Sequence, residues 1–229
     1  DNAVLTLAGD IEPAAALEQV KRYFGDIEPG GPIPTLPGNP DVESLIGQTV
    51  RDHVVADVPL PRVIMAFRSP SYGAEDFAVA EVSQALLGMG RASRLYRRLV
   101  RERQVAKGVV TYVYPLLTGA SMFLVWATGY PGGDPEELER AMIEEIDALA
   151  EAQQSEIDRA IALTETDLVR ALERTAERAD LLSMFDLYFD DPGRLNRELD
   201  RLRAVTLDQI KDFAGTRLVA DNRAIVTYQ

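Results

Sequence analysis

The sequence contains no cysteine, one histidine and one tryptophan among its 229 residues. Without cysteine the chain has no disulfide, no thiolate nucleophile and no sulfur ligand for a metal, and its redox compartment stays open. Catalytic zinc sites take several protein ligands, usually including two or more His or Cys side chains. The one histidine, His53, therefore reads as an ordinary residue of a strand. We expect neither a catalytic residue nor a metal ligand in this chain.

Positive charge and long apolar runs are also scarce. The chain has 24 Lys and Arg against 37 Asp and Glu, a net charge of −13, and a pI near 4.6. Binding to a phosphate backbone depends on basic surface, so we expect no nucleic-acid partner. No apolar run approaches the roughly 20 residues that span a bilayer, and the first residues resemble no signal peptide. We therefore expect no membrane partner either.

The charges that are present are unevenly distributed. Residues 134–180 hold fifteen acids and five arginines, whereas residues 90–107 hold seven basic residues and one acid. The acids suit the solvated face of two long helices, or a surface that attracts a cationic peptide or basic partner. The arginines could instead face those acids within the same fold.

The basic segment has the period of an amphipathic helix that ends near residue 104. At about 100° per residue, its apolar and basic side chains fall on opposite sides. The apolar side holds Ala92, Leu95, Tyr96 and Leu99, and the basic side holds Arg91, Arg94, Arg97, Arg98 and Arg101.

The first part of the chain predicts one strand and one helix. Residues 2–8 read as a buried strand. Residues 13–24 read as a helix that begins with a proline, buries Leu17, Val20 and Phe24, and stops at Gly25. Five prolines follow within residues 28–40, which excludes a helix or a central strand and predicts an extended, semi-rigid linker.

The rest of the chain predicts five strands and several helices. We expect strands at 49–56, 62–68, 108–114, 121–130 and 223–228, the third and fourth forming a hairpin. Strand 62–68 is apolar enough for burial on both faces, and Phe123 and Trp126 are expected in the core. Helices are expected at 74–87, 135–151, 154–178, 181–188, 193–203 and 207–218, the last with a capping box from Thr206 and Gln209. This pattern predicts an α+β fold, a two-layer domain with helices packed on one face of a sheet.

A short pattern that occurs twice in the sequence suggests the domain boundaries. An Asp-Asn pair precedes an apolar strand at residues 1–7 and again at 221–227. We interpret residues 1–28 as the tail of a preceding α/β unit, 29–40 as the proline-rich linker, and 41–229 as one whole domain.

Several motifs in this order resemble a known family. After the linker come Arg62-Val63-Ile64-Met65-Ala66-Phe67, a helix ending in Ala85-Leu86-Leu87-Gly88, and Ser93-Arg94-Leu95-Tyr96. With the hairpin, the acidic helices and Asp221-Asn222-Arg223, they resemble the second, non-catalytic domain of pitrilysin-type (insulinase-like, mitochondrial-processing-peptidase-like) zinc metallopeptidases. The resemblance spans nearly the whole chain.

The resemblance implies a function for a longer parent protein. That family binds zinc through a His-x-x-Glu-His motif and a further Glu, which would lie in a zinc-bearing half preceding Asp1. We expect no cofactor in this chain, zinc in that half, and a chamber wall around a peptide substrate as this domain's role. The alternative is a structural or partner-binding subunit related to peptidases but without activity. Resemblance to bacterial envelope members suggests a periplasmic parent.

One departure from the family concerns substrate binding. Members that complete the active site carry an Arg and, seven residues on, a Tyr, at the positions of Val100 and Lys107. Because it lacks both residues, this chain resembles the subunit that carries the zinc motif and relies on a homologous second subunit for the Arg and Tyr. By the same resemblance, Arg101 and Lys107 are the candidates for facing substrate or a partner.

Overall fold

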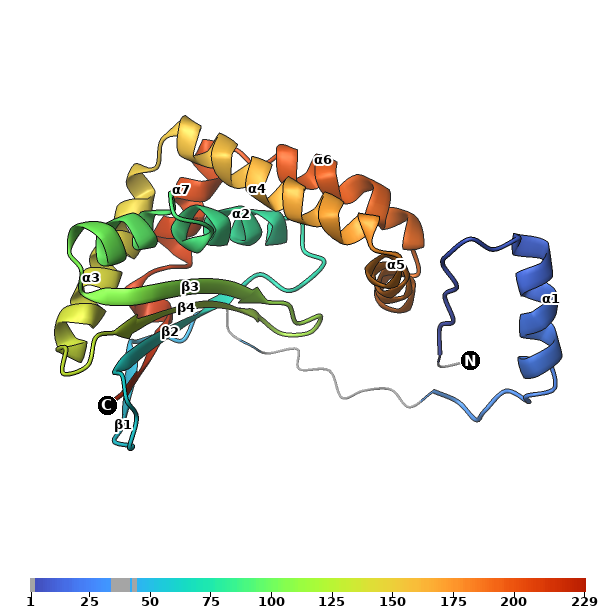
Figure 1. The fold of residues 1–229 in the computed structure, drawn as a ribbon, viewed down its shortest axis with the longest axis horizontal. Coiled ribbons are helices and arrows are strands. Elements are labelled where there is room, and N and C mark those ends of the chain that lie inside the picture. The colour runs from blue at the N-terminus through green and yellow to red at the C-terminus, as the bar shows by residue number, and fades with distance from the viewer. Residues whose placement is uncertain (1–2, 34–41, 43–44) are drawn as a thin grey trace. The chain divides into compact units, whose positions relative to one another are not determined.

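The computed structural model describes residues 3–33, 42 and 45–229 (Figure 1). Contacts between Cα atoms divide the chain into two compact units. The smaller unit comprises residues 1–38 and 166–199, and the larger unit comprises residues 39–165 and 200–229. Residues 34–40 of the expected linker lie outside the described residues, and the boundaries expected at residues 28 and 40 stay a prediction. None of the helices in the described part of the chain is long and apolar enough to cross a membrane.

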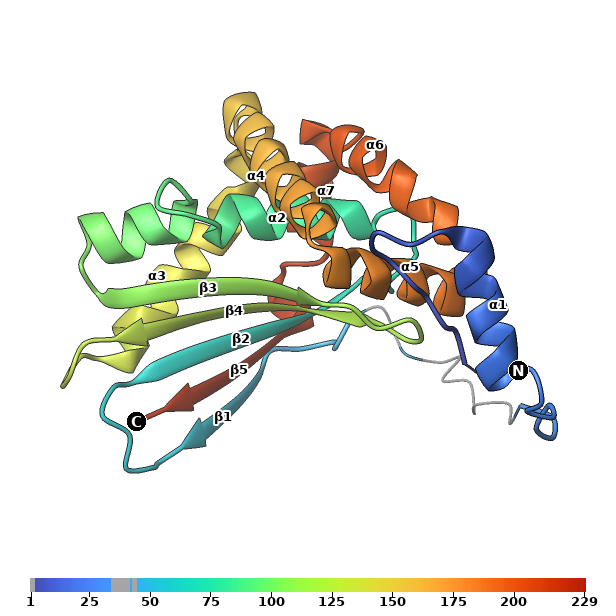
Figure 2. The same cartoon turned by 45° about the vertical axis from the view of Figure 1, so that its right-hand side comes forward.

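The larger unit is built on a five-stranded mixed sheet (Figure 2). Its strands are β1 (Val50–Val54), β2 (Arg62–Ser69), β3 (Ala106–Tyr114), β4 (Ser121–Gly129) and β5 (Arg223–Tyr228). Their order is β1-β5-β2-β4-β3, in which β1 and β5 pair in parallel and every other pair is antiparallel. The five expected strands of this unit and the hairpin are confirmed, as is the α+β fold.

Helices cover one face of this sheet. They include α2 (Phe77–Gly88), the π-helix η1 (Tyr96–Glu102), α3 (Pro135–Asp147), the 3₁₀ turn η2 (Ala148–Glu151), the start of α4 (Gln154–Glu173), the end of α6 (Glu198–Arg203) and α7 (Leu207–Thr216). Helices α2 and α3 contact β4, and Phe213 of α7 packs against Phe123 of that strand with ring centroids 5.8 Å apart. Nine of the twelve residues of α2 are buried, as expected of a helix that is apolar all round.

Side chains of alternate strand residues form the core beneath these helices. Val63, Met65 and Phe67 of β2 are at most 1% exposed, as are Phe123 and Val125 of β4. Because successive strand residues point to opposite faces, this pattern places the core on the helix-covered face alone. The expectation that strand 62–68 is buried on both faces is therefore wrong for this chain, because Ile64 and Ala66 are only half-buried.

The capping box expected for the last helix is present. The Gln209 N–H donates to Thr206 Oγ1 at 3.3 Å, and the Thr206 N–H donates to Gln209 Oε1 at 2.9 Å. This reciprocal pair satisfies two backbone donors at a helix start.

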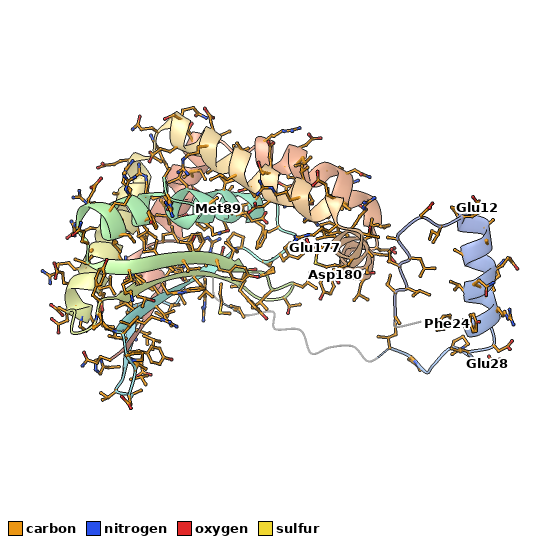
Figure 3. The ribbon with its side chains drawn as sticks, viewed as in Figure 1. Glu12, Phe24, Glu28, Met89, Glu177 and Asp180 are labelled. Carbon is orange, nitrogen blue, oxygen red and sulfur yellow. The ribbon has the colours of Figure 1, made fainter. Side chains whose placement is uncertain are left out.

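In the smaller unit, the helix expected at 13–24 is confirmed as α1 (Pro13–Phe24), but its burial is not. Figure 3 labels Phe24 in its last turn, where the side chain is 54% exposed; Leu17 is 53% exposed and Val20 is half-buried. The strand expected at 2–8 is also wrong, since residues 3–8 form no part of a sheet. Both predictions go with the interpretation of residues 1–28 as the tail of a preceding unit, against which these apolar side chains would pack. Within this unit, Ser183 Oγ donates to Thr6 Oγ1 at 2.7 Å, which links this segment to the rest of the unit.

The long helix expected at 154–178 is broken. Helix α4 ends at Glu173, Arg174 is extended (φ −86°, ψ 120°), and α5 (Thr175–Phe189) begins at once and absorbs the expected piece at 181–188. The Arg178 Nε donates to the freed Leu172 carbonyl at 3.0 Å. The helix expected at 193–203 is likewise two elements, the 3₁₀ helix η3 (Pro192–Arg197) followed by α6.

Candidate functional site

The face of the sheet opposite the helices is the main candidate surface, and we call it the open face. The strand register arranges its side chains in rungs that cross all five strands. One rung holds Val50, Ala224, Ala66, Leu124 and Tyr112. The next holds Asp52, Val226, Ile64, Trp126 and Val110. Most of these side chains are apolar.

Aromatic side chains gather toward one side of the open face. Tyr112 and Tyr114 on the edge strand β3 are each 47% exposed, and Trp126 on β4 is half-buried. The prediction that Phe123 and Trp126 both belong to the core is right for Phe123 and wrong for Trp126. Strand residues that are an odd number of positions apart face opposite sides of a sheet. Phe123 therefore lies on the helix-covered face and Trp126 on the open face.

The charge of the sheet is opposite in sign to that of the whole chain. Its strands carry five Arg or Lys and one acid, Asp52, whereas the chain carries −13. Arg62 and Arg68 belong to the open face of β2, and Lys107 is the extra residue of a β-bulge in β3. Bulges redirect side chains at sheet edges. The open face therefore combines apolar area with basic groups, which suits an apolar or anionic peptide better than a basic one.

The basic segment is helical as expected, but its last turns are a π-helix. Leu95 and Leu99 are fully buried, which confirms part of the expected apolar side. Ala92 is exposed and Arg94 is only 9% exposed, so both were assigned to the wrong side. Ala92 lies in a turn before the helix begins, so the helical period does not apply to it, and the π-helix begins only at Tyr96. Arg94 also has a partly buried partner, Glu156, at 2.7 Å.

Several arginines of this segment, including Arg98 and Arg103, face acids of the same unit, which was one of the expectations for the basic segment. Arg98 lies 3.4 Å from Glu145, and Arg103 pairs with Glu144. Burial raises the pKa of Glu145, an effect that nearby arginines, Arg98 foremost, only partly offset. Burial likewise tends to raise the pKa of Glu156, but hydrogen bonds from Arg94 and from the Gln153 N–H outweigh it and lower that pKa. These pairs give Arg94, Arg98 and Arg103 a structural role within the larger unit.

The two residues expected to face substrate or a partner are both exposed. Arg101 lies in η1, and Lys107 lies at the bulge that follows it. Neither side chain has an ion pair with any described residue. Val100 is half-buried in η1. Between η1 and β3, Gln104 takes a left-handed conformation (φ 54°). The structure makes both cations accessible, and their role stays a prediction.

The donor set in the described chain does not fit zinc. His53 is exposed on edge strand β1, beside a pocket of about 450 Å³ that also contains Asp52, Glu136 and Glu139. Glu139 is already engaged by Arg51 at 3.1 Å. Among residues 3–33, 42 and 45–229, no three His, Cys, Asp or Glu side chains form a group that could hold a metal ion.

A family model described as the peptidase M16 inactive domain matches residues 1–164. The chain belongs to the peptidase M16 inactive domains. This confirms the resemblance to the pitrilysin-type family. The family is zinc-dependent, and the present M16 inactive domain lacks a donor set for that metal in its described part.

Solved structures share the fold of this M16 inactive domain. A protease from Helicobacter pylori matches with 20% identity and a TM-score of 0.86, over 97% of this chain and 54% of that chain. The peptidase M16 inactive domain from Pseudomonas fluorescens matches with 16% identity and a TM-score of 0.79, over 96% of this chain and 51% of that chain. A protein proposed to be a zinc protease, from Bordetella pertussis Tohama I, matches with 23% identity and a TM-score of 0.65, over 74% of this chain and 94% of that chain.

The chain spans about half the length of the Helicobacter pylori protease. At these identities the likeness concerns the fold. No curated protein matches the chain.

The residues that sequence reasoning missed are those of the open face. The signal was present in β3, where Val109, Val110, Tyr112, Val113 and Tyr114 place apolar side chains on both faces. A strand of an antiparallel sheet with one face in water usually alternates apolar and polar residues. Apolar residues on both faces indicate that the second face also meets something.

Proposed function

We propose that this M16 inactive domain is the non-catalytic half of a zinc metalloendopeptidase and that its open face forms part of the wall of a chamber around a peptide. The observation that supports this is the apolar face of the sheet that no described helix of the larger unit covers. A contiguous exposed apolar surface marks a contact site for a partner or ligand. Zinc and its ligands would belong to another domain of the parent protein, beside which an inactive domain acts.

The test uses the full-length parent. Tyr112→Ser removes an aromatic side chain from the open face, where it is 47% exposed. We expect a several-fold lower kcat/KM against an unstructured peptide, with an unchanged melting temperature. The matched control is Val169→Ser on α4, which is 43% exposed and lies outside the open face. Equal kcat/KM in both variants would contradict the role of the open face.

The alternative is a structural or partner-binding subunit without peptidase activity. It would leave the parent inactive against every peptide with zinc supplied, while Tyr112→Ser weakened binding of another protein chain. The same measurements therefore separate the two functions.

We also propose that the parent takes the missing Arg and Tyr from a homologous second subunit, because Val100 and Lys107 occupy those positions. Mixing the parent with a homologue that carries the Arg and Tyr should raise activity well above that of either protein, since substrate gains charge-assisted and aromatic contacts. Full activity of the purified parent, with no gain on mixing, would contradict a two-subunit enzyme.

A further inference from the structure

One pocket on the open face has the features of a specific binding site. It lies where the connection between β1 and β2 meets strands β2 and β5, and it has a volume of about 430 Å³. Its lining residues are Val58, Pro59, Leu60, Arg62, Ile64 and Tyr228. Five of the six are apolar or aromatic, and one is a cation.

Backbone hydrogen bonds hold the wall of this pocket in place. The Ala56 N–H donates to the Gln229 carbonyl at 2.9 Å, and the Gly129 N–H donates to the Pro61 carbonyl at 2.8 Å. Pro59 and Pro61 restrict the backbone between those two anchors. A wall that is fixed beforehand loses little conformational entropy when a ligand binds.

The cation in the pocket is available for a ligand. Arg62 is exposed, and its side chain forms no hydrogen bond or ion pair with any residue in the described part of the chain. A guanidinium has five N–H donors in a planar fork that matches a carboxylate. The open-face neighbours of Arg62 across the register are Tyr228 and Thr128, neither of which carries negative charge.

The pocket therefore lines one space of about 430 Å³ with an apolar wall and an unpaired guanidinium. An internal acidic residue cannot satisfy both, because its carboxylate replaces the apolar side chain. The last residue of a peptide carries both groups, an apolar side chain and the α-carboxylate. We propose that this pocket binds the C-terminal residue of a peptide, with its apolar side chain against Leu60, Ile64 and Tyr228 and its carboxylate on Arg62. In the proposed function this peptide would be a substrate or product in the chamber, so that part of the inference rests on the proposed function.

The fluorescence of Trp126 provides the signal for a binding experiment on this chain alone. It is the only tryptophan, and it pairs with Ile64 of the pocket across β2 and β4. The probe is a tryptophan-free hexapeptide that ends in leucine, with a free carboxylate in one version and a C-terminal amide in the other. A third peptide is amidated and has glutamate as its last residue. We expect saturable fluorescence change with the free acid and at least tenfold weaker binding of both amides, the effect of losing one charge-assisted contact.

Substitutions assign the contact to one side chain. Arg62→Gln should abolish the preference for the free acid, and Arg62→Lys should retain part of it, because the charge remains while the planar fork is lost. The matched control is Arg91→Gln, another exposed arginine outside the sheet, which should bind as the unchanged chain does. Circular dichroism checks that each variant is folded.

Three results would contradict the proposal that this pocket binds a peptide C-terminus. They are equal affinity for the free acid and its amide, tighter binding of the glutamate amide than of the free acid, and an unchanged preference for the free acid in Arg62→Gln. Different results would contradict the proposed function: a parent protein without peptidase activity, or a Tyr112→Ser variant whose kcat/KM is unchanged. Free-acid binding to this chain together with an inactive parent would refute the peptidase role and retain the pocket.

Discussion

Arg94 and Glu156 form a two-point ion pair in the larger unit. Arg94 Nε donates to Glu156 Oε1 at 3.0 Å, and its Nη2 donates to Oε2 at 2.7 Å. The remaining Nη1 donates to the Ala148 carbonyl at 2.7 Å. The two side chains are 10% and 19% exposed. The pair therefore joins the basic segment to the start of α4 with little competition from water.

Removing one partner of this pair should destabilise the fold strongly. Arg94→Ala leaves Glu156 without its cation in a partly dry site, and we expect a loss of about 3 kcal/mol in the free energy of unfolding. Urea unfolding measures it. The control is Arg97→Ala, whose contact with Glu102 is long (3.8 Å) and exposed, and which should cost about 0.5 kcal/mol or less. Similar losses in both variants would contradict a special role for Arg94.

Glu156 and Glu145 should affect stability in opposite directions with pH. The lowered pKa of Glu156 means that its contribution is present above the unfolded pKa and is lost as the pH falls through the folded pKa. The raised pKa of Glu145 means that the fold is favoured at low pH and loses stability as the pH rises from the unfolded to the folded pKa.

At pH 7, Glu156→Gln should therefore lower the free energy of unfolding, and Glu145→Gln should leave it equal or raise it. Urea unfolding between about pH 3 and about pH 7 tests both, since the unfolded pKa of glutamate is about 4.3. The Glu145→Gln difference from the unchanged chain should shrink as the pH falls toward that value, and the Glu156→Gln difference should shrink only below it. Two variants that lose the same stability at neutral pH would refute this assignment.

Gly88 is required by the approach of α2 to β3. A Cβ at this position would lie 2.5 Å from Thr111 Cγ2 and closer still to its Oγ1. Thr111 cannot easily move away, because its Oγ1 donates to the Gln84 carbonyl at 2.9 Å. We expect Gly88→Ala to lower the free energy of unfolding by about 2 kcal/mol, despite the higher helix propensity of alanine.

Gly215 offers the matched control for this overlap. It also lies in a helix, but a Cβ there would meet nothing within 4 Å. Gly215→Ala should be neutral or stabilising by up to about 1 kcal/mol. If both glycines respond alike to substitution in thermal unfolding, steric overlap with Thr111 is not the cause.

The N-terminal segment should exchange its amide hydrogens faster than the sheet. Helix α1 has no buried residue, and Leu5, Leu7 and Leu17 are each more than half exposed. Few buried contacts imply a low free energy of local opening. Hydrogen exchange by mass spectrometry should show residues 3–27 unprotected when β2 is still protected. Equal protection in a verified monomer would show that this segment is as stable as the core.

Zinc should not bind stoichiometrically to this chain. His53 has no matched ligands around it in the described residues, and the nearby Glu139 is held by Arg51. After dialysis against zinc, metal analysis should give well under one ion per chain, and the melting temperature should not rise. One tightly held zinc per chain would contradict the view that the metal belongs to another domain.

Local signals predicted the elements, while partners distant in sequence decided which side chains are buried. The capping box at Thr206 and the helix start at Pro13 depend on neighbours a few residues away, and both were predictable. The burial of Arg94 depends on Glu156, 62 positions later in the chain. The exposure of Trp126 depends on which face of the sheet the helices cover. Periodicity identifies two faces of an element but not what lies against each of them.

The place of β5 in the sheet has a consequence for how the protein forms. Strand β5 lies between β1 and β2, although it comes more than 150 residues after both in sequence. Among the described residues, edge strand β1 pairs only with β5, so during synthesis residues 50–54 lack that strand partner until residues 223–228 leave the ribosome. Strand pairs this distant in sequence form slowly, because the entropy cost of closing the long loop arises before the stabilising contacts are made. Until then an unpaired edge of β2 and the apolar open face are accessible to other nascent chains, which makes late synthesis the stage most exposed to aggregation.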